Sequence, residues 1–161
     1  MPGFISLPMQ FKLVQLQNPV TTNSAVTTDV ISTKNGLRHW IVVNLTQAAG
    51  HATSISLKQA TSVAGTTNKA GPTVAIWANE DTAASDTLVK QTSAASYTVA
   101  ADVKNKMVVF EIDPVALDVA GGYDCLYLLF GASSQATNFV EVTAVIDAKY
   151  KQATPPSVII D

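Results

Sequence analysis

The sequence predicts an all-β protein, an antiparallel β-sandwich of the immunoglobulin-like or jelly-roll-like kind. Short runs rich in Val, Ile, Leu and aromatic residues recur along the chain, turn-forming residues separate nearly all of them, and helix signals are scarce. With 161 residues, 47% of them hydrophobic and 14% charged, the chain has the length of one domain and enough apolar side chains for a core. We therefore expect a single domain over 1–161.

The expected strands are runs in which apolar residues alternate with polar ones or follow one another without interruption. Gly, Asn and Ser gather between these runs, at 34–36, 49–52, 65–72, 120–122 and 131–138, and 65–72 is expected to be a loop. Strands are predicted at 11–17, 29–33, 39–45, 54–59, 73–78, 86–91, 97–100, 106–112, 123–130 and 138–150.

Helical structure is expected only as a short turn near 113–120. Asp113 can cap this turn and Pro114 fits its first helical position. The two ends of the sequence, about 1–10 and 151–161, are apolar but interrupted by proline. Because a residue before proline avoids the helical region, we expect both ends to be extended arms that lie on a partner.

The alternation also predicts which side chains face the core, because residues two apart on a strand share a face of the sheet. Trp40 and Trp77 are predicted to point outward, each from a strand whose neighbouring side chains point inward. The expected inward set is Ile41, Val43, Leu45, Val74, Ile76, Val140, Val142, Ala144 and Ile146, and the expected outward set includes Val42, Asn44, Glu141, Thr143 and Asp147.

Charge and hydropathy argue against several partners. The formal net charge is −2 and no Lys/Arg cluster is present, so we expect no nucleic-acid binding. No apolar run approaches the roughly 20 residues that a membrane-spanning helix needs. The amino end has no basic segment and Pro8 breaks its apolar stretch, which is not typical of a secretion signal. Cys125, the single cysteine, is expected to be a small buried side chain.

Residues that could carry chemistry do not form a known pattern. His39 and His51 lack metal-ligand spacing, and we expect them to be solvated or hydrogen-bonded at the surface. Glu80, Asp81 and Asp86 share one expected loop, where calcium binding is the alternative to a solvated loop, but they do not fit an EF-hand. Neither a nucleophile elbow nor a phosphate-binding loop is present. We therefore expect no catalytic residue, cofactor or metal, and no enzyme.

The aromatic residues allow two interpretations. If Trp40, Trp77, Tyr97 and Tyr123 share one exposed face, they could stack on sugar rings or contact another protein. Alternatively, either tryptophan could belong to the core, as in many sandwiches.

The order of several segments resembles that of the capsid decoration or cement proteins of tailed phages and prophages. These segments are "DVISTKNGLRHWIVVNL", "SISLKQATS", "MVVFEIDPVALDVAGGYDCLYLLFGASS" and "VEVTAVIDAKY", and the resemblance covers roughly 28–150. The pair "EIDPVALD" and "GGYDCLYL" in that order is its most distinctive part, while 60–100 and both arms do not align. The resemblance implies a non-enzymatic β-sandwich that binds the outside of an icosahedral head, bridges major capsid protein subunits and stabilises the shell.

On this interpretation, the protein is made in the bacterial host cytoplasm and ends on the outer surface of the virion. Its expected partners are the major capsid protein and neighbouring copies of itself, as a dimer or trimer. The alternatives are a carbohydrate-binding module of a tail, fibre or secreted protein and, less favoured, a head-completion or tail-tube protein. The candidate contact residues are Arg38, Trp40, Trp77, Phe4, Ile5, Val158, Ile159 and Ile160.

Overall fold

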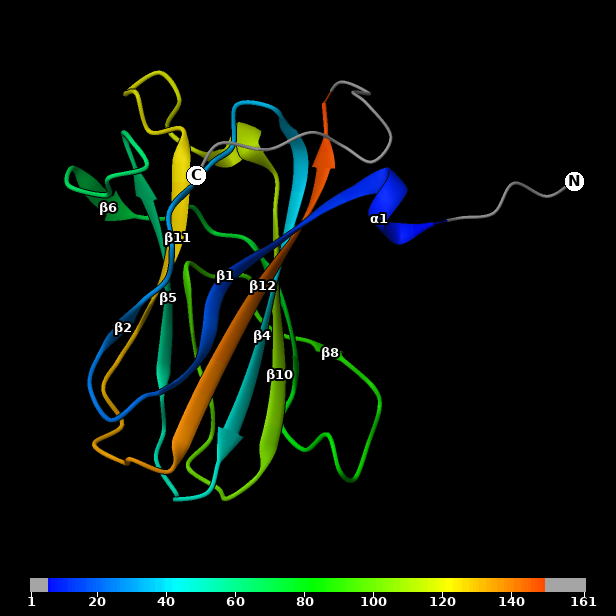
Figure 1. The fold of residues 1–161 in the computed structure, drawn as a ribbon, viewed down its shortest axis with the longest axis vertical. Coiled ribbons are helices and arrows are strands. Elements are labelled where there is room, and N and C mark those ends of the chain that lie inside the picture. The colour runs from blue at the N-terminus through cyan, green and yellow to red at the C-terminus, as the bar shows by residue number, and fades with distance from the viewer. Residues whose placement is uncertain (1–5, 150–161) are drawn as a thin grey trace, which may run out of the picture.

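The computed structural model describes residues 6–149, which form two antiparallel sheets packed face to face (Figure 1). Sheet A has the strand order β1-β12-β4-β10-β7-β8, and sheet B has the order β2-β11-β5-β6, with β3 pairing β11 and β9 pairing β5. The predicted all-β sandwich is therefore confirmed. The elements are α1 (Leu7–Gln10), β1 (Phe11–Thr21), β2 (Val26–Thr27), β3 (Ile31–Ser32), β4 (Gly36–Gln47), β5 (Ser54–Ala60), β6 (Asn68–Ala70), β7 (Ala75–Asn79), β8 (Val89–Lys90), β9 (Ser96–Thr98), β10 (Asn105–Ile112), η1 (Pro114–Ala116), β11 (Cys125–Phe130) and β12 (Asn138–Ala148).

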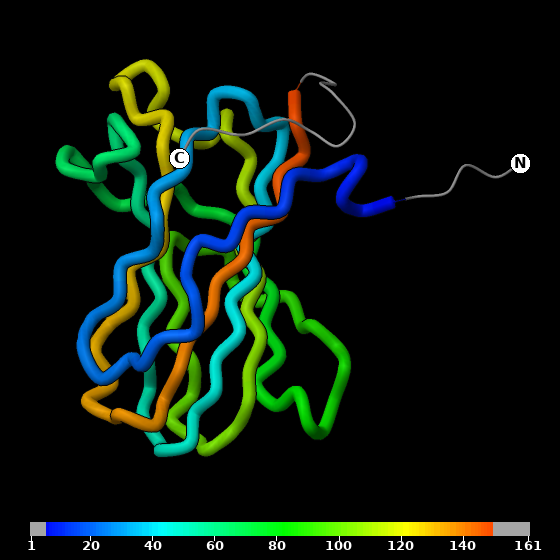
Figure 2. Tube along the Cα trace, viewed as in Figure 1, coloured from blue at the N-terminus to red at the C-terminus, as the bar shows by residue number. Residues whose placement is uncertain are grey.

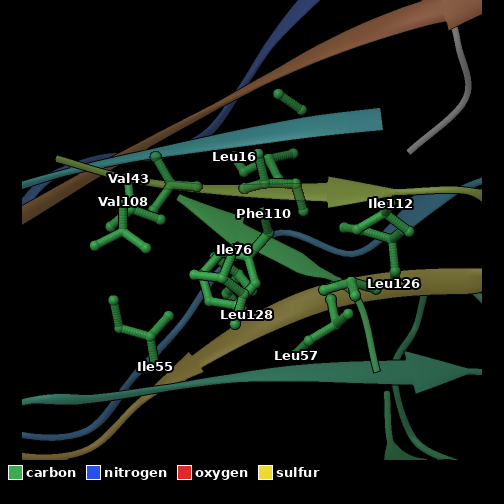
Figure 3. Packing of buried hydrophobic residues seen from close by; sticks show 14 of the residues in the cluster. Leu16, Val43, Ile55, Leu57, Ile76, Val108, Phe110, Ile112, Leu126 and Leu128 are labelled. Atoms are coloured by element: carbon green, nitrogen blue, oxygen red, sulfur yellow. The ribbon is translucent and has the colours of Figure 1, made fainter. Parts of the chain in front are cut away.

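The core lies between the two sheets and is built by strict alternation along the strands (Figure 3). Phe110 and Val108 of β10 face Leu126 and Leu128 of β11 across this layer, and all four side chains are buried. Every residue predicted to point inward is buried, which confirms the assignment of faces. The long strands β4 and β12 pair without interruption from Asn138 and Gln47 to Asp147 and Arg38, and form the middle of sheet A.

The helical turn expected near 113–120 is present as the single 3₁₀ turn η1. The side chain of Asp113 accepts a hydrogen bond from the backbone N–H of Val115, as the capping prediction requires.

Two other expectations about secondary structure are wrong. The segment 65–72 contains strand β6, which pairs with the edge of β5, and residues 7–10 of the expected extended arm form α1. Pro8 fits that helix because a first-turn residue needs no N–H donor.

His39 also corrects the sequence-based expectation of a surface imidazole. It lies on β4 with the same parity as Ile41 and Val43, so its side chain points into the sandwich and is fully buried. Gly36 packs directly on the imidazole ring, and a Cβ at position 36 would overlap it. Burial lowers the pKa of His39 to about 4. The imidazole is therefore a neutral core side chain at physiological pH.

Candidate interface on the outer face of sheet A

The face of sheet A that points away from the core carries an apolar cluster. The strand pairings place Trp40 of β4 opposite Val145 of β12, and Trp77 of β7 opposite Val109 of β10. These side chains are partly exposed, whereas their neighbours along each strand are buried. We call this cluster the outer-face patch, and its members are Leu13, Trp40, Val42, Trp77, Val109 and Val145.

Trp40 is held in place by neighbours on three strands. Its ring packs edge to face against Phe11 of β1, with ring centroids 5.9 Å apart and an interplanar angle of 79°. Beside it, Arg38 Nη1 donates a hydrogen bond to Glu111 Oε1 of β10 at 2.9 Å. The Arg38 side chain is 46% exposed, so this ion pair mainly orients the guanidinium. The predicted Arg38 and Trp40 contact residues thus form one preorganised group.

Trp77 lies on the same face but two strands away, with β10 between the two tryptophans. Lys90 of β8 pairs with it, and the Lys90 ammonium lies 5.9 Å from the centroid of the indole ring. Both tryptophans therefore point outward, as predicted, and neither belongs to the core. The structure places them on one surface without direct contact between them.

The other predicted aromatic residues lie elsewhere. Tyr97 is on β9 of sheet B, where its hydroxyl donates a hydrogen bond to Glu80 Oε1 at 2.6 Å. Tyr123 precedes β11, and the Lys69 ammonium lies 4.1 Å from the centroid of its ring. The hypothesis of one exposed face with four aromatic residues is therefore wrong, because Tyr97 packs against the core between the sheets and Tyr123 lies beside Lys69 of β6.

The remaining predicted contact residues, Phe4, Ile5, Val158, Ile159 and Ile160, lie outside the described residues. The structure does show where the segments that carry them join the fold. Phe11, near the start of β1, pairs with Asp147, near the end of β12. The first and last described strands thus run side by side, and β1 begins where β12 ends, at one end of the sandwich (Figure 2).

That end of the sandwich also holds a groove with a volume of about 820 Å³, which we call the end groove. Arg38 and Trp40 line it, so the outer-face patch and the groove are continuous. Three exposed apolar side chains in the groove, Leu37, Val115 and Val119, were not predicted as contacts. The sequence could not assign the two valines to a face, because they lie in a turn and the alternation rule applies only to strands.

Two of the acidic residues that raised the possibility of calcium, Glu80 and Asp81, are paired with lysines. Lys106 is fully buried, and its ammonium lies 2.9 Å from Glu80 Oε2 and 3.0 Å from Asp102 Oδ1. Lys104 in turn bridges Asp102 and Asp81. Within residues 6–149, no group of three or more His, Cys, Asp or Glu side chains could hold a metal ion. These carboxylates therefore serve as partners of the lysines.

Among residues 6–149, no helix has the length and hydropathy needed to cross a membrane.

Cys125 is buried in β11, as predicted, and burial raises the pKa of its thiol to about 11. Because the thiolate is the reactive form, we expect a disulfide reagent such as Ellman's reagent to leave the native protein unmodified at pH 8. One thiol per chain should react after unfolding in guanidinium. Rapid stoichiometric reaction of the native protein would show that this part of sheet B opens readily.

No family model matches the chain, and no curated protein matches it. Among solved structures, it is similar to the crystal structure of the SPBc2 prophage-derived protein YomS, with a TM-score of 0.47 and 9% sequence identity over 84% of this chain and 91% of that chain. A likeness of this degree transfers neither a function nor a binding site from one protein to the other.

Proposed function

We propose that this chain is a non-enzymatic structural protein of a tailed phage that binds the outer surface of the head and stabilises the capsid by bridging major capsid protein subunits. The sequence resemblance described above suggests this role. On this proposal, the outer-face patch and the terminal segments contact the major capsid protein or a neighbouring copy. The protein is made in the host cytoplasm and functions on the virion surface.

The observation that carries the proposal is the outer-face patch itself. Two tryptophans and four aliphatic side chains occupy the outward face of a sheet, where rigid pairing holds them at fixed spacing. Partly exposed aromatic side chains, with an arginine beside them, are the residue types that dominate binding energy in protein interfaces. Their continuity with the end where both terminal segments join the fold gives one extended surface for a partner.

The stabilising role can be tested by heating heads of the cognate phage prepared without this protein. Added protein should raise the temperature at which the heads release DNA, measured with a DNA-binding dye. Deleting 151–161 tests the contribution of the C-terminal segment, which should lower occupancy on the heads. Release at the same temperature with and without saturating protein would contradict the stabilising role.

Replacing Trp40 with serine should weaken binding to heads by at least about 30-fold, because a central aromatic contact contributes about 2 kcal/mol or more. Val103 offers a matched control, since it is exposed and precedes β10 at the opposite end of the sandwich. Val103→Ser should bind like the wild type. Sedimentation isotherms measure both variants, and thermal unfolding checks that each is folded. Equal affinities for the two variants would remove Trp40 from the interface.

Binding and assembly experiments distinguish the proposed function from its alternatives. A carbohydrate-binding module should show saturable changes in tryptophan fluorescence on titration with polysaccharides, because Trp40 and Trp77 are both partly exposed. A head-completion or tail-tube protein should form rings in isolation. On our proposal, neither behaviour is expected, and the protein binds intact heads instead.

A further inference from the structure

The end groove lies where β4 and β11 begin and β12 ends, at the upper end of the sandwich in Figure 1. Its walls come from the turn before β4, the η1 region, the start of β11 and the end of β12. The lining residues are Thr33, Lys34, Gly36, Leu37, Arg38, Trp40, Asp113, Pro114, Val115, Val119, Asp124, Asp147 and Lys149.

The apolar part of this lining is unusually open to solvent. Val115 is 87% exposed, Val119 55% and Leu37 52%. Grouped apolar side chains with such exposure mark a binding surface. The charges around them are partly neutralised within the chain, since Lys34 pairs with Asp124 at 3.1 Å and Arg38 pairs with Glu111. The groove is therefore suited to an apolar segment of protein rather than to a charged small molecule.

The sequence contains such a segment directly beyond the groove. Lys149 lines the groove, and the chain continues as "YKQATPPSVIID" over 150–161, which includes the apolar triplet Val158–Ile160. Eight residues separate Lys149 from this triplet, so the triplet can reach up to about 30 Å from its point of exit.

We propose that the Val158–Ile160 segment of one copy binds in the end groove of a neighbouring copy. In the sequence, Pro155 and Pro156 stand immediately before the triplet, and proline disfavours a helix there. Reciprocal exchange between two copies uses the same surface twice, as a closed symmetric contact requires. On a crowded surface, the fixed spacing of copies would strengthen each contact further.

Mixing two variants of the full chain, each with one added cysteine, tests this exchange. Val115→Cys is mixed with a size-tagged Ile159→Cys chain under mild oxidation, and covalent heterodimers are counted on a non-reducing gel. Cys125 can stay, because it is buried. The heterodimer yield should exceed that of Val103→Cys with the same partner by roughly tenfold, because binding raises the effective concentration of the two thiols. Val103 is also exposed but lies at the opposite end.

Equal yields for Val115→Cys and Val103→Cys would overturn the proposal. So would a doubly substituted Val115→Cys/Ile159→Cys chain that forms its disulfide only within one chain. As an independent measurement, Val115→Asp should weaken self-association of the otherwise wild-type protein at least about tenfold in light scattering, because burying a carboxylate in an apolar groove is costly. Unchanged self-association would contradict the proposal. These experiments contain no heads, so their failure is distinguishable from a failure of the proposed head binding.

Discussion

Replacing Lys106 with methionine is expected to lower the free energy of unfolding by about 2–4 kcal/mol. The side chain is fully buried, and its ammonium donates to the carbonyl of Ala100 at 2.6 Å in addition to its ion pairs with Glu80 and Asp102. Methionine keeps the apolar stem but leaves the carbonyl and both carboxylates without this partner. Glu80 and Asp102 are 32% and 43% exposed, so water offsets part of the loss and the full cost of a buried charge is not expected.

Lys104 provides the matched control for this change. It pairs with Asp81 and Asp102 in the same cluster, but its side chain is 41% exposed. Lys104→Met should therefore leave the urea midpoint nearly unchanged, whereas Lys106→Met should lower it clearly with the same slope. If the two variants unfold at the same midpoint, the buried ammonium does not hold the β9–β10 end of the sandwich together.

Acidification is expected to remove about 3 kcal/mol of stability through His39 alone. Its pKa is about 4 in the folded protein, below the ordinary value of 6.5, because burial disfavours the imidazolium. Between these two values the unfolded chain binds more protons, so the free energy of unfolding falls as pH decreases. The contribution is fully present above about pH 6.5 and is lost as pH falls through 4. Within the described residues, neither ring nitrogen of His39 has a hydrogen-bond partner.

His39→Leu should abolish most of this pH dependence and leave the protein at least as stable at pH 7, because leucine has no polar atoms to desolvate. Urea unfolding of both proteins at several values between pH 7 and 4.5 measures the difference. This window avoids the carboxyl groups of Asp81, Asp102 and Asp118, whose pKa values lie below the ordinary 3.8 because lysine ammonium groups donate hydrogen bonds to them. Parallel curves for wild type and variant would show that His39 is not the source.

The long strands were predictable because a single rule, alternation, governs them. In β4, β10 and β12 every second side chain is buried, so the inward sets and the outward direction of Trp40 and Trp77 followed from sequence. The same rule, applied to position 39, would have placed His39 inside. Its polarity suggested the surface, but the parity of the strand determined its position.

The features that escaped prediction depend on contacts between distant segments. Strand β6 has little strand propensity and exists because Asn68–Ala70 can pair with the edge of β5. Burial of Lys106 likewise depends on Glu80 and Asp102 converging from separate loops. The end groove is assembled from four segments between Thr33 and Lys149, none of which suggests a groove by itself.

Co-sedimentation with undecorated heads of the cognate phage tests head binding most directly. The purified protein is expected to pellet with the heads and to saturate at a fixed ratio to the major capsid protein, as sites on a symmetric shell require. A polysaccharide pull-down in parallel should retain none of it. Protein that stays in the supernatant at all head concentrations, especially if the polysaccharide retains it, would contradict the proposed decoration of the head.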